Sequence, residues 1–233
     1  VRALKLSTTN TDAIFADVTA DKWYAKNVAT AAAAGLIVGY DGNFRPEDNI
    51  TYQEAVTVLV RMAGYEPAAE SKGGYPNGYL SVANQYGFTK NAAGIGANVV
   101  KRGTTAILTN NALTIGMMEQ TGFGTNTNYE ITDKTILEEY LDTKKLEGQI
   151  TGNYFTKLTS NASLEKDTIE IDNVVYKTTD DNAQNLLGYK VTYYLTEKSN
   201  SDKVVVLTLA ESGQNKEFTI NGDDLESVEA GKI

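Results

Sequence analysis

The feature that most limits the folds open to this chain is an internal repeat of about 50 residues. Gly35 and Gly87 end two similar segments that lie 52 positions apart. Residues 50–56 match residues 100–106 at a spacing of 50, and residues 1–4 match residues 60–63 at a spacing of 59. A period of this size is typical of stacked supersecondary units. Each copy is predicted to be a helix, a glycine stop, a loop and a second helix, and the chain is predicted to begin inside the last helix of a preceding repeat.

Local signals in the first complete copy support this prediction. Thr51 and Glu54 have the spacing of a capping box, and apolar residues follow them at helical spacing. The first helix is predicted to start near Asp21 and to end at Gly35, in a left-handed glycine. Residues 39–46 between the two helices are dense in turn formers, which predicts an ordered loop.

The residue types that are missing exclude several classes of enzyme. The 233 residues contain no His and no Cys. A Ser-His-Asp triad, a thiolate nucleophile, a disulfide and an ordinary structural zinc site are therefore excluded. Catalysis would have to depend on carboxylates, Lys, Tyr or Ser, and no cofactor is expected.

Charge is divided unevenly along the chain, whose net charge is -9. Residues 1–120 carry 10 basic and 10 acidic side chains, whereas residues 121–233 carry 11 basic and 20 acidic ones. This asymmetry favours two domains, and the acidic half would repel a phosphate backbone, so no nucleic-acid partner is expected. The longest apolar run, residues 31–38, is much shorter than the roughly 20 residues of a membrane span.

One ordered set of residues in the first half is recognisable. The set comprises Phe15, Asp17, Val18, Trp23, Tyr24, Gly35, Gly39, Tyr40, Asp41, Gly42, Asn43, Phe44, Arg45, Pro46, Thr51 and Glu54. This arrangement resembles the S-layer homology repeat. On this interpretation residues 1–14 are the tail of a preceding repeat, residues 15–65 are one repeat, and residues 66–121 are a degenerate one.

The resemblance implies a fold, a partner and a location. Such repeats pack together as a helical bundle and hold a surface protein non-covalently to a secondary cell-wall polysaccharide, often one with acidic ketal groups such as pyruvyl. An extracellular location in the cell wall or S-layer is implied. The family's second helix starts with Thr-Arg-Ala-Glu, whose Arg helps to bind the acidic sugar, and a helix N-terminus with an Arg suits a carboxylate. The candidate glycan-binding residues are Arg102, Arg45, Thr51, Tyr52, Glu54, Asp17 and Trp23.

The two copies each match this motif in part. Thr51 and Glu54 fit the first copy, where Tyr52 stands at the Arg position. The second copy keeps Arg102 but has different residues around it.

Other roles for some of these residues stay open. Trp23, Phe15 and Phe44 are expected to be core and loop-anchoring residues rather than sugar platforms. Arg45 is either a ligand-binding residue or a solvated loop residue. The acidic residues between positions 41 and 48 do not have the spacing of an EF-hand loop, so no metal site is expected.

The second half is predicted to be a small acidic β domain. Residues 122–145 are predicted to be a loop and a linking helix, with a boundary in the loop at 122–128 and the helix at 132–141. Residues 146–233 then form the β domain, a small barrel or sandwich, so the whole chain is predicted to be α+β. The predicted strands are 147–157, 168–177, 189–197, 203–210 and 216–220, and the fourth, apolar on both faces near residues 204–207, is expected to be central.

Two functions follow from these predictions. The first is a non-enzymatic surface protein that is anchored to wall polysaccharide through its repeats. The second is a structural subunit of an extracellular lattice or fibre, in which the degenerate repeats mediate self-association. A glycosidase is disfavoured, because the neighbouring acids Asp180, Asp181, Asp223 and Asp224 are expected to be solvated on turns.

Overall fold

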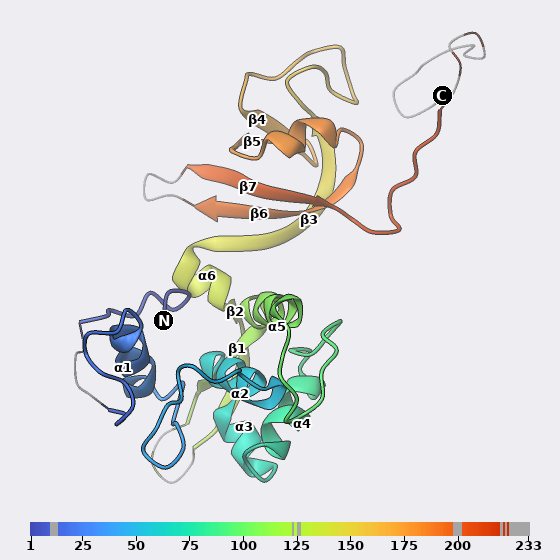
Figure 1. Ribbon diagram of the computed structural model, residues 1–233. Helices are drawn as coiled ribbons and strands as arrows, with labels where there is room; N and C mark the ends of the chain where they lie inside the picture. The colour runs from blue at the N-terminus through green and yellow to red at the C-terminus, as the bar shows by residue number, and fades with distance from the viewer. Residues whose placement is uncertain are drawn as a thin grey trace. The chain divides into compact units, whose positions relative to one another are not determined.

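The chain forms two compact units, residues 1–141 and residues 142–233, in a computed structural model (Figure 1). The structure describes residues 1–9, 14–122, 124, 127–197, 202–219, 221 and 223. The prediction of a mixed fold with a C-terminal sheet is confirmed. Within the described residues, no helix is long and apolar enough to cross a membrane.

Unit 1 contains the helices of both repeat copies. They are α1 (Ala25–Ala33), α2 (Tyr52–Met62), α3 (Glu66–Ser71), α4 (Asn77–Gln85) and α5 (Arg102–Thr114). Helices α2 to α5 gather together with α1 to one side of them (Figure 1). The predicted first helix is shorter than expected, because the residues from Asp21 to Tyr24 form turns and the helix starts at Ala25.

Helices α1 and α2 of unit 1 end in the same motif. After α1, Gly35 has a φ of 71°, and the amide of Leu36 donates to the carbonyl of Ala31. This is the Schellman arrangement, which favours glycine because a Cβ is penalised at positive φ. The amide of Gly35 also donates to the carbonyl of Ala32, and the same two hydrogen bonds occur within residues 60–65 and again within residues 1–6. These two segments, which match in sequence, therefore also share the same backbone hydrogen bonds.

A two-stranded sheet follows α5 in unit 1. It consists of β1 (Gly116–Gln120) and β2 (Tyr129–Thr135), which pair antiparallel, and it is followed by the short helix α6 (Ile136–Leu141). The predicted helix at 132–141 is therefore wrong over its first four residues. The reason is local: Thr135 and Glu138 form a reciprocal cap, which starts the helix at Ile136. The predicted loop at 122–128 lies partly outside the described residues.

Two apolar clusters hold unit 1 together. The larger one is built around α2, α4 and α5 and contains the fully buried side chains of Val60, Tyr65, Tyr79, Phe88 and Leu108. The smaller one joins Phe15 and Val18 to α1, and the partly buried Phe44 packs against it. The prediction that Phe15 and Phe44 anchor the core and the loop is confirmed.

Unit 2 is a five-stranded sheet that closes on itself. Its strands are β3 (Thr143–Gly152), β4 (Thr168–Ile171), β5 (Val174–Thr178), β6 (Lys190–Glu197) and β7 (Lys203–Ala210). The strand order is β3-β4-β5-β7-β6, and β6 returns to pair with β3. The strand β7 lies between β5 and β6, as every strand of a closed sheet lies between two others, and the expectation that both of its faces are buried is wrong because Val206 and Leu207 are exposed. Ile150, Ile169, Ile171, Val191 and Val205 fill the interior.

Two of the predicted strands of unit 2 are wrong. The predicted strand at 168–177 is a hairpin, because Asp172 and Asn173 both adopt positive φ, 47° and 65°, and turn the chain. Asn and Asp tolerate this conformation better than other residues with a Cβ, so the pair can make a two-residue turn of type I′. No strand is present at residues 216–219 of the predicted fifth strand, and Ile220 lies outside the described residues.

Asp180 has a structural role in unit 2. Its Oδ2 accepts hydrogen bonds from the amide and the hydroxyl of Thr208, both at 2.6 Å. Its Oδ1 accepts from the amide of Asn182 at the start of the 3₁₀ helix η1 (Asp181–Asn185). Oδ2 of this carboxylate therefore ties the loop to β7, and Oδ1 caps η1.

Candidate functional site

A groove in unit 1 runs beside helix α2. Its volume is about 780 Å³, which is within the range of about 300–1,000 Å³ for ligand pockets. The loop after α1 forms one wall, α2 forms another, and a residue that precedes α4 completes it. The groove is lined by residues 36–40, 44–46, 48–50, 54, 57, 58, 61 and 75.

The loop wall is held in place by Asp17. Its carboxylate accepts the amide hydrogens of Phe44 at 2.8 Å and Arg45 at 2.6 Å. These backbone hydrogen bonds, that of Phe44 first, keep the pKa of Asp17 below its ordinary value despite some desolvation. The ring of Phe15 stacks on that of Phe44 with 5.7 Å between centroids. Asp17, a candidate sugar ligand from sequence, therefore anchors the loop.

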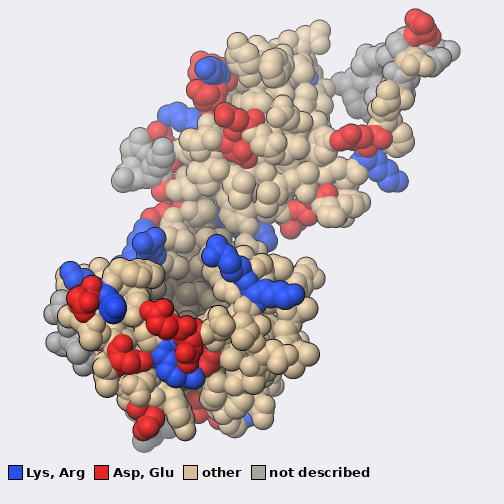
Figure 2. Space-filling view, viewed as in Figure 1, with Lys and Arg blue, Asp and Glu red and all other residues tan. Residues whose placement is uncertain are grey.

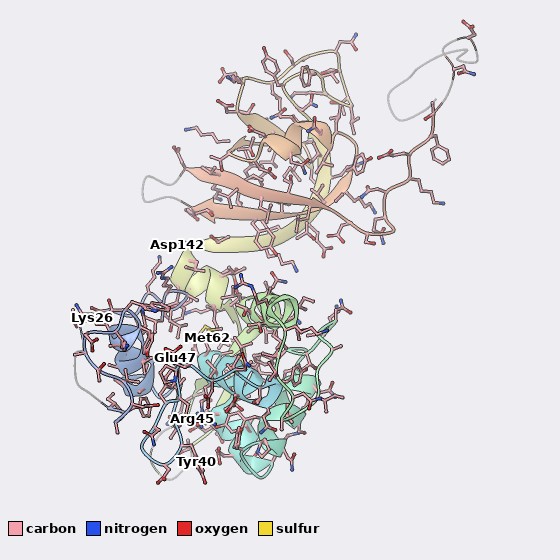
Figure 3. All side chains as sticks on the ribbon, viewed as in Figure 1. Lys26, Tyr40, Arg45, Glu47, Met62 and Asp142 are labelled. Atoms are coloured by element: carbon pink, nitrogen blue, oxygen red, sulfur yellow. The ribbon has the colours of Figure 1, made fainter. Side chains whose placement is uncertain are left out.

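This loop presents Tyr40 and Arg45, with Glu47 close to them in sequence (Figure 3). The ring of Tyr40 is 78% exposed and lies at the groove. Arg45 has a φ of 60°, and its Nη2 donates to Oε1 of Glu54 at 3.0 Å. Its Nη1 also lies 3.6 Å from Oδ2 of Asp48. Acidic and basic side chains accordingly stand together on the visible face of unit 1 (Figure 2).

Glu54 links this arginine to the start of α2. Its Oε2 accepts from the amide and the hydroxyl of Thr51, at 2.8 and 2.7 Å. The predicted capping box is therefore present. Burial raises the pKa of Glu54, but the hydrogen bonds from Thr51 and the charge of Arg45 outweigh it, so that the pKa lies below its ordinary value. The carboxylate stays ionised and holds Arg45 at the groove.

The N-terminus of α2 does not offer free amides to an anion. The amide of Tyr52 donates to the carbonyl of Asn98 at 2.8 Å, and that of Gln53 donates to Gly96 at 2.9 Å. The ring of Tyr52 is buried, and its hydroxyl donates to the carbonyl of Ala92 at 3.2 Å. Tyr52 is thus a core residue and not, as its motif position implied, a groove residue.

Arg102 lies elsewhere. It is exposed in the first turn of α5, and its N-cap residue Lys101 makes no side-chain capping hydrogen bond. Arg102 is not among the residues that line the groove beside α2. The structure therefore does not bring the family's matched arginine together with Arg45 and Glu54.

Trp23 differs from its expected role in the core. It is 86% exposed and contacts Tyr24 edge to face, with 5.5 Å between ring centroids. At the 52-residue period its counterpart is Tyr75, which lines the groove and accepts a hydrogen bond from Gln53 at 2.9 Å. The period could therefore have identified Tyr75 as a groove residue.

Arg61 is another groove residue that the sequence analysis did not propose. It lies in the last turn of α2, where an arginine is easily explained by the helix dipole alone. The sequence signal that could have drawn attention to Arg61 is its match to Arg2 at the 59-residue spacing. In the described part of the chain, no group of three or more acidic residues is placed to hold a metal ion.

The comparisons with known proteins agree with the resemblance. Residues 14–56 match the model of the S-layer homology domain. The middle cell wall protein of Brevibacillus brevis strain 47 is 37% identical over 128 residues, 54% of this chain. The surface layer protein of Brevibacillus choshinensis is 34% identical over 143 residues, 59% of this chain. The match spans only 12% of each relative's length. No solved structure matches the chain. The domain and the two relatives indicate a location at the cell surface, in the cell wall or S-layer.

Proposed function

We propose that this chain, whose residues 14–56 form an S-layer homology domain, attaches a surface protein non-covalently to a cell-wall polysaccharide, and that the groove beside α2 holds the sugar. The observation that carries the proposal is the composition of the groove, which is lined by a salt-bridged arginine and two exposed tyrosines. Tyr40 and Tyr75 provide flat apolar faces with a hydroxyl each, and Arg45 provides a cation.

Each of these groups suits a sugar. Aromatic faces pack against the C–H face of a pyranose ring, and an arginine fork pairs with an acidic substituent such as a pyruvyl carboxylate. Arg45 is held by Glu54 but is still half exposed, so a ligand can reach it without the cost of a deep desolvation. The groove is preformed, because Asp17 and the capping box fix its walls.

Calorimetry of the full chain with purified wall polysaccharide tests the proposal. Arg45→Asn removes the charge and suits the positive φ, since Asn tolerates the left-handed region. It should weaken binding about 10-fold, the equivalent of about 1.5 kcal/mol for a charged hydrogen bond. Arg102→Ala is the matched control, because it removes an exposed arginine outside the groove. If Arg102→Ala abolishes binding and Arg45→Asn does not, the site is the start of α5.

A second function, a structural subunit of a lattice or fibre, is favoured by exposed apolar side chains. Ile95 is 73% exposed and Val99 59% exposed in the loop before α5, and Trp23 is exposed in the first repeat. Contact between copies would cover such side chains. Sedimentation velocity over a range of concentrations tests this function. Assembly that proceeds without polysaccharide and is lost in Ile95→Ser would favour it over anchoring.

We further propose that the closed sheet of unit 2 is a small barrel displayed at the surface and that it has no catalytic role. The support is the position of Asp180, whose two oxygens are both engaged in hydrogen bonds to backbone amides and a hydroxyl. Asp224 lies outside the described residues, so the pair of Asp223 and Asp224 provides no support for or against a catalytic role. Hydrolysis of a wall glycan by the chain would refute the proposal.

A further inference from the structure

Arg61 is the more deeply placed of the two arginines at the groove. Its side chain is 14% exposed, whereas that of Arg45 is 51% exposed. The Nε–H of Arg61 points to Oε1 of Glu66 at 2.9 Å and to the hydroxyl of Tyr79 at 3.2 Å. Within the described part of the chain, these are the hydrogen bonds that its guanidinium makes. For the two terminal amino groups no hydrogen bond is present in that part of the chain, and Arg61 is one of the residues that line the groove.

The partners that hold Arg61 come from the second repeat. Tyr79 is fully buried on α4, and its ring lies beneath the guanidinium with 5.2 Å from Cζ to the ring centroid. Its hydroxyl lies 2.8 Å from Oε1 of Glu66 and 3.1 Å from Oε1 of Glu70. Burial, together with the hydrogen bond to Glu66, raises the pKa of Tyr79 to about 12. At neutral pH the hydroxyl is protonated and donates to a carboxylate.

These contacts fix the orientation of the guanidinium. An arginine whose Nε is paired presents its two amino groups as a fork, which matches the two oxygens of a carboxylate or phosphate. Stacking on an aromatic ring removes the remaining freedom of the guanidinium plane. A fork that is already oriented loses less conformational entropy when an anion binds.

We propose that Arg61 is a second anion-binding residue of the groove beside Arg45, and that Glu66 and Tyr79 are positioning residues that aim its fork at an oxyanion substituent of the bound saccharide. This inference rests on the proposed function, because it names the ligand class of the same groove. It also makes the binding site a product of two repeats. The arginine belongs to the first repeat, and the residues that aim it belong to the second.

Four variants of the full chain separate these roles. Arg61→Lys keeps the charge and removes the fork. Tyr79→Phe keeps the ring beneath the guanidinium and removes the hydroxyl. Glu66→Gln keeps an acceptor and removes its charge. It tests the positioning role a second time, independently of Tyr79→Phe. Tyr86→Phe is the matched control, because Tyr86 packs on Tyr65 and does not line the groove.

The first measurement needs no ligand. The ¹⁵N-resolved NMR signal of the Arg61 Nε–H should be shifted and slow to exchange in the wild-type chain, since the proton is held by Glu66. It should exchange faster in Tyr79→Phe and Glu66→Gln and stay unchanged in Tyr86→Phe. An unchanged signal in both Tyr79→Phe and Glu66→Gln would overturn the positioning role.

The second measurement is calorimetry with three preparations of wall polysaccharide: one with carboxylate substituents, one with phosphate substituents, and one with its acidic groups removed. Arg61→Lys should weaken binding of the preferred acidic form about 10-fold or more, and Tyr79→Phe about 3- to 10-fold. Neither should change binding of the stripped form. If Arg45→Asn weakens binding while Arg61→Lys and Tyr79→Phe do not, this inference is wrong and the proposed function stands. If the wild-type chain binds none of the preparations, the proposed function and the ligand assigned to Arg61 both fall.

Discussion

Arg45 and Glu54 join the loop of the first repeat to the start of its second helix, with 3.0 Å between Nη2 and Oε1. The two oxygens of Glu54 have different tasks. Oε1 holds the arginine at the groove, and Oε2 closes the cap of α2 on Thr51. The residue that starts the helix is thus also the residue that orients a groove side chain. Under the proposed function, stability and ligand binding would therefore be coupled at this one carboxylate.

Replacing Glu54 by Ala should destabilise unit 1. The substitution removes one half of the capping box, and caps are worth about 0.5–2 kcal/mol. It also removes a partly exposed ion pair, which is worth about 0.2–1 kcal/mol. We expect a lower urea midpoint by circular dichroism at 222 nm, because the long helices of the described residues lie in unit 1. Glu54→Gln, which can still accept from Thr51, should lose less. Equal losses in the two variants would show that the cap contributes little.

Two left-handed glycines of the same repeat should respond differently to alanine. Gly35 and Gly39 have φ values of 71° and 70°. A Cβ at Gly35 would meet nothing within 4 Å, whereas one at Gly39 would lie 2.5 Å from the ring of Phe15 and 2.6 Å from the carbonyl of Asn43. Gly35→Ala should therefore cost about 1 kcal/mol, the penalty for positive φ alone. Gly39→Ala should cost distinctly more, because the loop or the ring must move. Equal costs by chemical denaturation would contradict the close packing of the loop.

The features that the sequence predicted correctly are those set by neighbouring residues. The capping box at Thr51 and Glu54 and the left-handed Gly35 each depend on a few positions in a row. Residues 1–6 make the same two backbone hydrogen bonds as residues 60–65, which they match in sequence, but they form turns and not the predicted end of a helix. Short-range rules are sufficient for such elements.

The features that the sequence did not predict depend on contacts between distant segments. Tyr52 occupies a motif position for binding, but segment 92–98 of the other copy covers it. Arg61 follows an apolar stripe and resembles an ordinary helix-end cation until Glu66 and Tyr79 are placed beside it. Trp23 is a large apolar residue of the kind expected in a core, but no described segment packs over it enough to bury it. The repeat period and the helical periodicity of the sequence do not predict contacts of this kind between distant segments.

Acid should destabilise unit 1 through Asp17 and Glu54. Both carboxylates have a folded-state pKa below the ordinary values of 3.8 and 4.5. The unfolded chain therefore takes up protons first as the pH falls, so this stability is fully present above the ordinary values and is lost below them. We expect a steady urea midpoint from pH 7 to about 5 and a decline below about pH 4.5. Asp17→Asn and Glu54→Gln should flatten the decline, while Asp41→Asn on the same loop should not.

In unit 2 the ion pair between Lys157 and Glu170 should be strongly coupled. Nζ lies 2.6 Å from Oε2, the Glu170 side chain is only 5% exposed, and the hydroxyl of Thr151 donates to its other oxygen at 2.9 Å. Lys157→Met would leave a buried charge without its cation, which costs about 3–5 kcal/mol. Lys157→Met combined with Glu170→Gln removes both charges and should recover most of that loss.

The pH dependence of these variants distinguishes the loss of a charge partner from a simple packing defect. In the wild type, the hydrogen bond and charge of Lys157 hold the pKa of Glu170 below its ordinary value against the opposing effect of burial. In Lys157→Met only the effect of burial and the Thr151 hydrogen bond remain, so the pKa should rise. The destabilisation should then shrink as the pH falls through the raised pKa and protonates the group. Calorimetric unfolding at pH 7 and pH 5 measures it. Lys177→Met, which breaks the exposed pair with Asp202, should cost less than about 1 kcal/mol at both pH values. A loss in Lys157→Met that is the same at pH 7 and pH 5 would mean that packing, not charge, is responsible.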